Sequence, residues 1–228
     1  MKCVALLSGG KDSVMAVHVA REHAWDVPVA LCVRPAEDDA WMFHTPGLDV
    51  VPAVAECLGL DLVEAPCRTG PEEEVEALQE ALVRVRDGHG VDAVLSGALA
   101  SDYQRTRIDR IGHRVGLKTF APLWHKEPTA YMQTFAGRGW DVRFSRVAAD
   151  GLGPTWAGRR LDGGALADLA SLPTRPHPAG EGGEFETLVL DAPGYRKRIV
   201  VEAAHVEATA SRATWVVDSW RIASKGPP

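Results

Sequence analysis

The feature that most constrains the fold of this chain is the alternation of short apolar runs with helical patterns in its first half. Runs typical of strands span residues 3–7, 27–33, 61–66 and 92–97. Patterns typical of helices span residues 13–24, 49–58, 72–87 and 102–115. This alternation predicts βαβ units, that is, a Rossmann-like α/β arrangement in which a parallel sheet carries helices on both faces. Right-handed crossovers then bring the loops that follow the strands to one edge of the sheet, where ligands bind.

The pattern changes near residue 125. A helix is predicted at 129–137, a strand at 141–148 and a short helix near 162–171. Three strand-like runs follow at 185–191, 195–204 and 212–223, with no helical pattern between them. Strands in succession indicate a smaller α+β domain with a largely antiparallel sheet. We therefore expect two domains, residues 1–125 and residues 126–228.

Composition and charge narrow the class of protein. The chain has 228 residues, of which 46% are hydrophobic and 25% are charged, which is ordinary for a soluble globular protein. Its net charge of -6 argues against a dedicated nucleic-acid binder. The four cysteines form no Cys-x-x-Cys pair, the first apolar run is too short for a signal peptide, and no apolar window approaches the length of a membrane span. We therefore expect a reduced, cytoplasmic protein with no membrane segment and no direct contact with nucleic acid.

The loop after the first predicted strand reads Ser-Gly-Gly-Lys-Asp-Ser. Its two glycines let phosphate oxygens approach the backbone amides, and the helix that follows offers unpaired N–H groups at the positive end of its dipole. Lys11 adds a positive charge, the two serines can donate hydroxyl hydrogens, and Asp12 can hold Mg²⁺ through water or cap the helix. The candidate phosphate-binding residues are therefore Ser8, Gly9, Gly10, Lys11, Asp12 and Ser13.

The spacing of this loop excludes a Walker A motif, because Ala5 and Asp12 stand where that motif requires Gly and Ser or Thr. The loop resembles instead the S-G-G-x-D-S loop of the ATP pyrophosphatase (PP-loop) enzymes. That resemblance implies that the loop holds the β- and γ-phosphates of ATP as leaving pyrophosphate while a substrate oxygen attacks the α-phosphate. The alternative is an ordinary tight turn between a strand and a helix.

Longer motifs extend the resemblance from Ser8 to about Val201. They read WMFHTPG (41–47), SGALASDYQRTRIDRIGHRVGL (96–117), APLW (121–124), DGLGPTWAG (150–158) and AGEGGEFETLVLDAPGY (179–195). In this order they resemble the diphthine–ammonia ligase family. The resemblance implies an adenine nucleotide α-hydrolase-like ATP-binding domain followed by a smaller, strand-rich substrate-binding domain. The chain departs from the family pattern at Gly47, where Asn is expected.

What the resemblance implies is the last step in the formation of diphthamide. ATP adenylates the carboxylate of diphthine, a modified histidine on elongation factor 2, and ammonia then yields the amide, AMP and pyrophosphate. The expected cofactors are ATP and Mg²⁺, and the expected partners are elongation factor 2 and ammonia. A homodimer is compatible with the sequence.

Two further segments contain candidate site residues. The segment after the fourth strand places Gly97 on the ligand edge of the sheet, where a glycine permits a ligand to approach closely. The next helix can be capped by Ser101 or Asp102. Its first turns contain Tyr103, Gln104 and Arg105. Arg105 can contact a phosphate or a carboxylate with two hydrogen bonds. The alternative for this segment is a well-capped helix with solvated arginines.

His44, in the loop after the second strand, is a candidate for nucleotide binding.

The EGGEFET segment supplies three carboxylates, Glu181, Glu184 and Glu186, around a Gly-Gly pair. A carboxylate-lined site favours the trimethylammonium group of diphthine, and a carboxylate can take a proton from ammonium as a general base. The strand alternation predicts that Glu184 and Glu186 share one face. We expect Lys11, Asp12, Glu184 and Glu186 to be catalytic and Glu181 to bind the substrate. A glycine turn with solvated acids is the alternative.

Three other functions stay open at this point. A related PP-loop enzyme could amidate a different acceptor, a PP-loop enzyme could modify tRNA, and a nucleotide-binding module could lack catalysis. Sulfur transfer to tRNA commonly uses paired cysteines, and Cys57 and Cys67 are ten residues apart. We expect a ligase that forms a C–N bond.

Overall fold

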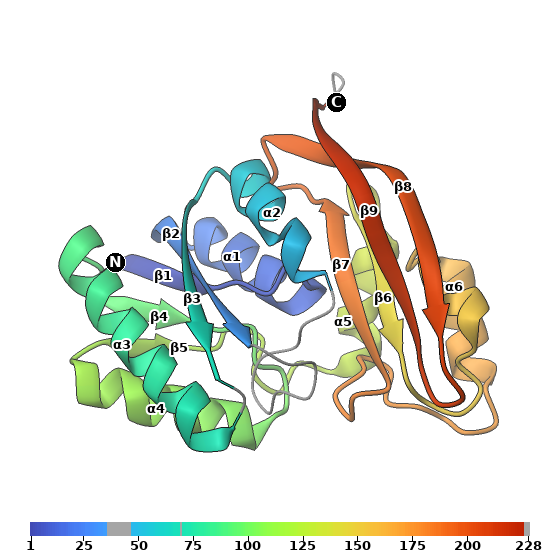
Figure 1. The fold of residues 1–228 in the computed structure, drawn as a ribbon, viewed down its shortest axis with the longest axis horizontal. Helices are drawn as coiled ribbons and strands as arrows, with labels where there is room; N and C mark the ends of the chain where they lie inside the picture. The colour runs from blue at the N-terminus through green and yellow to red at the C-terminus, as the bar shows by residue number, and fades with distance from the viewer. Residues whose placement is uncertain (36–46, 69, 226–228) are drawn as a thin grey trace. The chain divides into compact units, whose positions relative to one another are not determined.

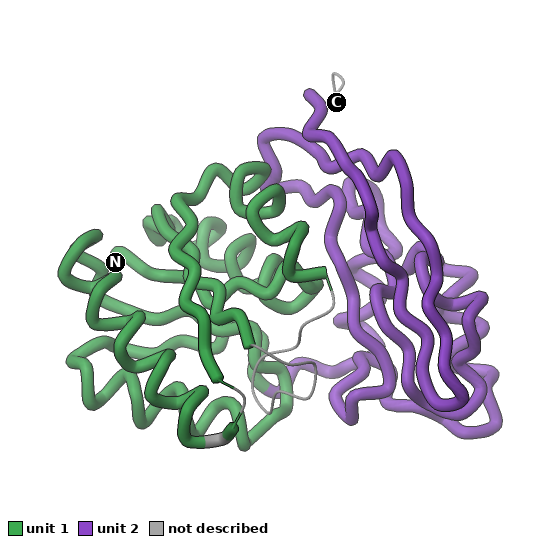
Figure 2. The backbone as a smooth tube through the Cα atoms, in the orientation of Figure 1, with its two compact units in different colours: residues 1–124 green, residues 125–228 purple. Residues whose placement is uncertain are grey.

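The computed structural model describes residues 1–35, 47–68 and 70–225. The chain divides into two compact units, Met1–Trp124 and His125–Pro228 (Figure 2). Each unit contains one sheet and its own helices (Figure 1).

The first unit is built on a five-stranded, fully parallel sheet with the strand order β3-β2-β1-β4-β5. Its strands are β1 (Lys2–Leu6), β2 (Asp26–Pro35), β3 (Asp61–Cys67), β4 (Ala93–Leu95) and β5 (Lys118–Phe120). Its helices are α1 (Lys11–Glu22), α2 (Val51–Leu58), α3 (Pro71–His89) and α4 (Asp102–Val115), with a 3₁₀ turn η1 (Leu48–Val50) before α2. Helices α3 and α4 cover one face of the sheet, and α1 and α2 cover the other (Figure 1). The predicted α/β fold with helices on both faces is confirmed.

The strand order has a consequence for ligand binding. The chain moves from β1 outward to β3 and then returns to the other side of β1 with β4. Strand order therefore reverses between β1 and β4, and in open parallel sheets ligands bind beyond the carboxyl ends of the strands at such a point. The loop at residues 8–13 follows β1 directly, and Gly97 lies two residues after the end of β4.

The core between the parallel sheet and helices α3 and α4 is apolar. Side chains of β1, β2 and β4 pack against α3 and α4 through residues that include Val4, Leu31, Leu82 and Ile111, all at most 1% exposed. Helices α2 and α4 end at Gly59 and Gly116, and both residues adopt the left-handed conformation that glycine allows, with φ of 67° and 73°. The short strand β5 has no counterpart among the predicted elements.

The second unit contains a four-stranded antiparallel sheet with the strand order β7-β6-β9-β8. Its strands are β6 (Asp141–Val147), β7 (Phe185–Asp191), β8 (Lys197–Ala208) and β9 (Ala213–Ser224). Its helices are α5 (Pro128–Ala136) and α6 (Gly163–Ser171), with a 3₁₀ turn η2 (Pro154–Trp156) between β6 and α6. The predicted largely antiparallel sheet is confirmed.

The DGLGPTWAG segment builds the core of the second unit. Trp156 packs edge-on against Phe144 with ring centroids 5.3 Å apart, and Phe144 contacts Phe185 in the same way at 5.0 Å. Gly158 has a φ of +80°, and a Cβ there would lie 2.8 Å from the Trp215 ring. This position therefore requires glycine. The segment thus joins β6, β7 and β9 in one apolar cluster.

Within the described ranges, no helix has both the length and the apolar character that crossing a membrane requires.

Candidate functional site

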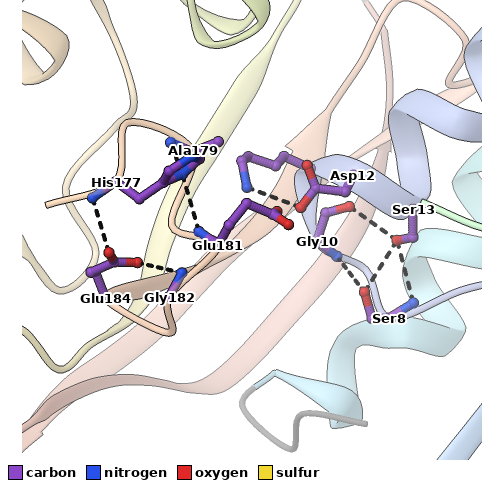
Figure 3. Close-up of polar contacts among 10 residues, drawn as sticks. Ser8, Gly10, Asp12, Ser13, His177, Ala179, Glu181, Gly182 and Glu184 are labelled. Carbon is purple, nitrogen blue, oxygen red and sulfur yellow. Dashed lines mark hydrogen bonds and ion pairs between the residues drawn. The ribbon is translucent and has the colours of Figure 1, made fainter. Parts of the chain in front are cut away.

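The loop at residues 8–13 is held by its own serines (Figure 3). The hydroxyl of Ser13 donates to the carbonyl oxygen of Gly10 at 3.0 Å and accepts from the backbone N–H and the hydroxyl of Ser8 at 3.3 and 3.2 Å. The Ser8 hydroxyl accepts from the Gly10 N–H at 3.4 Å. Gly9 has a φ of +78°, which a residue with a Cβ adopts at a cost. The two serines therefore fix the backbone that the sequence predicts to surround a phosphate.

The N-terminus of α1 differs from those of α4, α5 and α6. Those three helices begin with a side-chain cap from Ser101, Glu127 or Asp162. The N-cap of α1 is Gly10, which contributes no side-chain hydrogen bond. The first amides of a helix carry a partial positive charge and bind anions when no side chain caps them.

Lys11 begins α1 and is almost fully buried, with 3% of its surface exposed. A buried ammonium at the positive end of a helix dipole is unfavourable unless negative charge compensates it. The Asp12 carboxylate supplies part of this charge by accepting from the Lys11 Nζ at 2.9 Å. The phosphates of a nucleotide would add to this compensation, so the arrangement fits an anionic ligand.

Gly97 lies against the first turn of α1. A Cβ on Gly97 would lie 2.6 Å from the Asp12 carbonyl carbon and 2.7 Å from the Ser13 backbone nitrogen. These distances are shorter than any real contact of a Cβ, so β4 and the start of α1 approach this closely because the residue is glycine. The close approach of Gly97 in this structure is therefore to the backbone at the start of α1, next to the loop at residues 8–13.

The candidate residues of α4 have partners within the first unit. Ser101 caps the helix, and its hydroxyl accepts from the Gln104 N–H at 3.3 Å. The Arg105 Nε donates to the Asp109 carboxylate at 3.3 Å, and the Arg105 guanidinium lies 4.7 Å from the centre of the Trp124 ring. Tyr103 packs against the core of the first unit. The structure therefore gives these residues supporting contacts, and their contact with a substrate stays a prediction.

The EGGEFET segment forms a loop that leads into β7. The Glu184 carboxylate accepts from the His177 N–H at 2.9 Å and from the Gly182 N–H at 2.8 Å (Figure 3). Its two oxygens therefore hold the backbone of the loop, a role that the sequence pattern does not reveal. A catalytic role for Glu184 stays a prediction.

Glu186 lies on β7 directly opposite Arg146 of β6. Residues opposite each other in an antiparallel pair have Cβ atoms about 5 Å apart, so these two side chains start from neighbouring positions on the sheet. Arg146 is also opposite Thr214 of β9, and its Nε donates to the Thr214 hydroxyl at 3.4 Å. Glu186 thus lies on the sheet, whereas Glu181 and Glu184 lie in the loop before it.

His44 lies outside the described residues, so its predicted role stays a prediction. Gly47, where the motif resemblance leads us to expect Asn, has a φ of 79° and a ψ of 6°. Asn is among the few other residues that adopt this left-handed conformation readily. The backbone at this position is therefore compatible with either residue.

All four cysteines lie in the described part of the chain, and all are buried and form no disulfide bond. Burial raises the pKa of the Cys32 thiol to about 12 and that of the Cys67 thiol to about 11. Burial also raises the pKa of Cys3. A thiol acts as a nucleophile only when it is deprotonated, so these three side chains are poorly suited to sulfur chemistry near neutral pH.

Among residues 1–35, 47–68 and 70–225, no group of three or more His, Cys, Asp and Glu side chains is arranged to hold a metal ion. Mg²⁺ in nucleotide sites commonly binds one or two carboxylates together with phosphate oxygens. Asp12, beside the uncapped start of α1, is the carboxylate that fits this arrangement.

A parallel sheet with this strand order and a Ser-Gly-Gly-Lys-Asp-Ser loop at its switch point defines an α/β protein of the PP-loop class. Models of the diphthamide synthase N-terminal domain and of the diphthamide synthase C-terminal domain match residues 1–119 and 127–221. The chain therefore belongs to the diphthamide synthase, or diphthine–ammonia ligase, family, as its motifs predict.

Individual relatives agree with this assignment. The diphthine–ammonia ligase of Danio rerio is 31% identical over 226 residues, which cover 89% of this chain and 87% of the relative. The Bos taurus enzyme of the same name is 34% identical and covers 90% of this chain and 85% of its own. The Schizosaccharomyces pombe enzyme is 35% identical, and the match covers 88% of this chain but 36% of that longer protein.

Among solved structures, a predicted subunit of tRNA methyltransferase from Methanocaldococcus jannaschii aligns with 63% of this chain and 78% of its own, at a TM-score of 0.41 and 14% identity. Similarity at this level carries no argument about function.

Proposed function

We propose that this protein is an ATP-dependent amide ligase that converts diphthine on elongation factor 2 into diphthamide. Membership of a family whose curated relatives are named diphthine–ammonia ligases is the observation that carries this proposal. The anion-binding geometry of the loop after β1 supports it, because that loop suits a triphosphate.

The proposed reaction has two balanced steps. A carboxylate oxygen of diphthine attacks the α-phosphorus of ATP, the bond from that phosphorus to the bridging oxygen breaks, and pyrophosphate leaves. The nitrogen of ammonia then attacks the carbonyl carbon of the acyl-adenylate, AMP leaves, and the attacking nitrogen loses a proton to give the neutral amide.

The first unit would bind the nucleotide. Negative charge develops on the phosphates as pyrophosphate departs, and preorganised N–H donors with a buried cation stabilise such charge. The residues proposed for this role are Ser8, Gly9, Gly10, Lys11, Asp12 and Ser13. Mg²⁺, held by Asp12 and the phosphates, would neutralise part of the charge on the leaving group.

The second unit would bind the acceptor. Its loop and β7 carry Glu181 and Glu186, whose negative charge suits the trimethylammonium group of diphthine and an incoming ammonium ion. Either carboxylate can accept the proton that the attacking nitrogen releases. Tyr103, Gln104 and Arg105 of the first unit are proposed to contact the acceptor as well. The family of the chain argues against tRNA modification and against a module that only binds nucleotide.

Nucleotide products test this function. We expect the purified chain, supplied with ATP, Mg²⁺, ammonium and elongation factor 2 bearing diphthine, to form AMP and pyrophosphate and to convert the diphthine carboxylate into an amide. Chromatography of the nucleotides and mass spectrometry of the modified peptide measure these products. Formation of ADP, or the absence of AMP in the complete mixture, would show the proposal to be wrong.

The cysteines provide a second prediction. Because burial raises the pKa of Cys67 to about 11, its thiol is mostly protonated at pH 8 and is poorly suited to act as a nucleophile. We expect Cys67→Ala to form AMP at a rate within about twofold of the wild-type rate, since truncation of this small side chain costs only packing. A Cys67→Ala variant that keeps its fold but loses turnover would favour thiol chemistry over direct amidation.

A further inference from the structure

The loop that joins residue 177 to β7 is held by two of its own side chains. The Glu184 carboxylate uses one oxygen to accept from the His177 N–H at 2.9 Å and the other to accept from the Gly182 N–H at 2.8 Å. Hydrogen bonds from N–H groups to a carboxylate are stronger than those between neutral groups. Glu184 therefore ties the beginning of the loop to its tip.

The His177 ring also forms hydrogen bonds with the backbone of this loop. Its Nδ1 accepts from the Ala179 N–H at 3.2 Å and from the Glu181 N–H at 3.3 Å. Because both contacts come from N–H donors, Nδ1 must be an acceptor, and the ring hydrogen of the neutral imidazole lies on Nε2. The backbone of Glu181 is thus fixed by an imidazole nitrogen.

The loop backbone has little freedom apart from these contacts. The Gly180 N–H donates to the His177 carbonyl at 3.0 Å, and the Gly183 N–H donates to the Gly180 carbonyl at 3.1 Å. Gly180 has a φ of +77°, and a Cβ there would lie 2.7 Å from the Phe185 carbonyl oxygen. The Ala148 N–H donates to the Glu184 carbonyl at 2.8 Å and so joins the loop to the end of β6.

Glu181 lies within this framework and differs from Glu184 in the direction of its side chain. The Glu184 carboxylate turns back onto the loop, whereas the Glu181 side chain extends away from the contacts of His177 and Glu184 (Figure 3). The fixed backbone therefore sets the position and direction from which the Glu181 side chain extends.

We propose that His177 and Glu184 are positioning residues that hold the Glu181 carboxylate for the quaternary ammonium group of the acceptor. This inference rests on the proposed amidation of diphthine. It gives Glu184, the second glutamate of EGGEFET, a role in fixing the loop, and it assigns a function to His177, which precedes this motif.

Substitutions of His177 test whether the hydrogen bonds of its ring nitrogen, and not only its volume, hold the loop. The Oδ1 of His177→Asn can occupy the place of Nδ1 and accept both N–H groups, whereas His177→Gln places its polar atoms nearer to Nε2. Glu184→Gln replaces one accepting oxygen by an NH₂ group, so one N–H of the loop loses its partner. Glu202→Gln, an exposed change on β8, is the matched control.

The first measurement is amide hydrogen exchange in the full chain, which does not depend on activity. We expect exchange of residues 177–183 to become at least about tenfold faster in His177→Gln and Glu184→Gln, because each loses hydrogen bonds of the loop. His177→Asn and Glu202→Gln should exchange within about threefold of the wild type. Equal exchange in His177→Asn and His177→Gln would overturn the role given to Nδ1.

The second measurement is steady-state kinetics with diphthine-bearing elongation factor 2. We expect His177→Gln and Glu184→Gln to raise the KM for this protein about tenfold while the KM for ATP changes less than about twofold. His177→Asn should restore the KM for the acceptor. A parallel rise in both KM values would indicate general damage to the fold and would overturn the inference.

The two proposals fail in different ways. A wild-type chain that forms no AMP would overturn the amidation reaction and, with it, the acceptor role of Glu181. An active wild-type chain whose acceptor KM is unchanged in His177→Gln and in Glu184→Gln would overturn the positioning role alone.

Discussion

Replacing Lys11 with alanine should reduce kcat/KM for ATP by about 10²–10³, because removal of one preorganised donor from a site of developing negative charge has an effect of this size. The expected loss is large because the Lys11 ammonium is nearly fully buried at the start of α1, where water screens it little. Lys11→Arg should restore little of the activity, since a planar guanidinium is bulkier than an ammonium and the site is closely packed. AMP formation at varied ATP concentration measures the effect.

The control for this experiment is Lys118→Ala. Lys118 is an exposed lysine on β5 of the same unit, so its removal changes the net charge equally without touching the loop. Thermal unfolding of Lys11→Ala should show that the chain remains folded, because Asp12 is partly exposed and water can solvate its carboxylate when the ammonium is absent. A folded Lys11→Ala variant with turnover within about threefold of the wild type would contradict the role of Lys11 in charge stabilisation.

Replacing Gly97 with alanine should disable the loop by a steric route. The new Cβ would lie 2.6–2.8 Å from backbone atoms of Asp12 and Ser13, and backbone in a packed helix cannot rotate away as a side chain can. Overpacking of this kind costs about 1–3 kcal/mol. A displacement of about 1 Å in a catalytic group can reduce turnover by about 10²-fold, so we expect a loss of that order in AMP formation.

The matched control is Gly88→Ala in α3. A Cβ at Gly88 would meet no atom within 4 Å, and the residue lies inside a helix. Alanine there should raise the stability by about 0.4–1 kcal/mol, because alanine has fewer unfolded conformations than glycine. Calorimetry should therefore show a lower Tm for Gly97→Ala and an equal or higher Tm for Gly88→Ala. A Gly97→Ala variant as stable and as active as the wild type would show that β4 and α1 can separate without consequence.

Much of the fold follows from patterns in the sequence. Strands β1, β2 and β3 are apolar runs followed by helical periodicity, and α2 and α4 end at glycines, Gly59 and Gly116, that directly follow the helical patterns. Strand β5 was not predicted because its three residues, Lys-Thr-Phe, show no apolar run. The order of the strands depends on contacts between segments far apart in the chain, which periodicity does not encode.

The candidate site, like the fold, is predicted by the sequence only in part. The sequence predicts the phosphate-binding chemistry of residues 8–13, because glycine, lysine and a helix start have that property wherever they occur together. It does not predict that Ser13 organises the loop, since this depends on the conformation of the turn. It also does not predict that Gly97 approaches Asp12, since this depends on how β1 and β4 pair. The alternation that predicts one face for Glu184 and Glu186 applies to a strand, and Glu184 lies just before β7 begins. Its carboxylate therefore follows the geometry of the loop.

The proposed nucleotide site at the start of α1 would link nucleotide binding to the stability of the first unit. Gly10 supplies no side-chain cap, so an anion bound there would itself act as the cap of the helix. A ligand that binds only the folded state adds about 2.7 kcal/mol of stability when its concentration is 100 times its Kd. On the proposed function, the resistance of this unit to unfolding would therefore rise with the concentration of ATP around it.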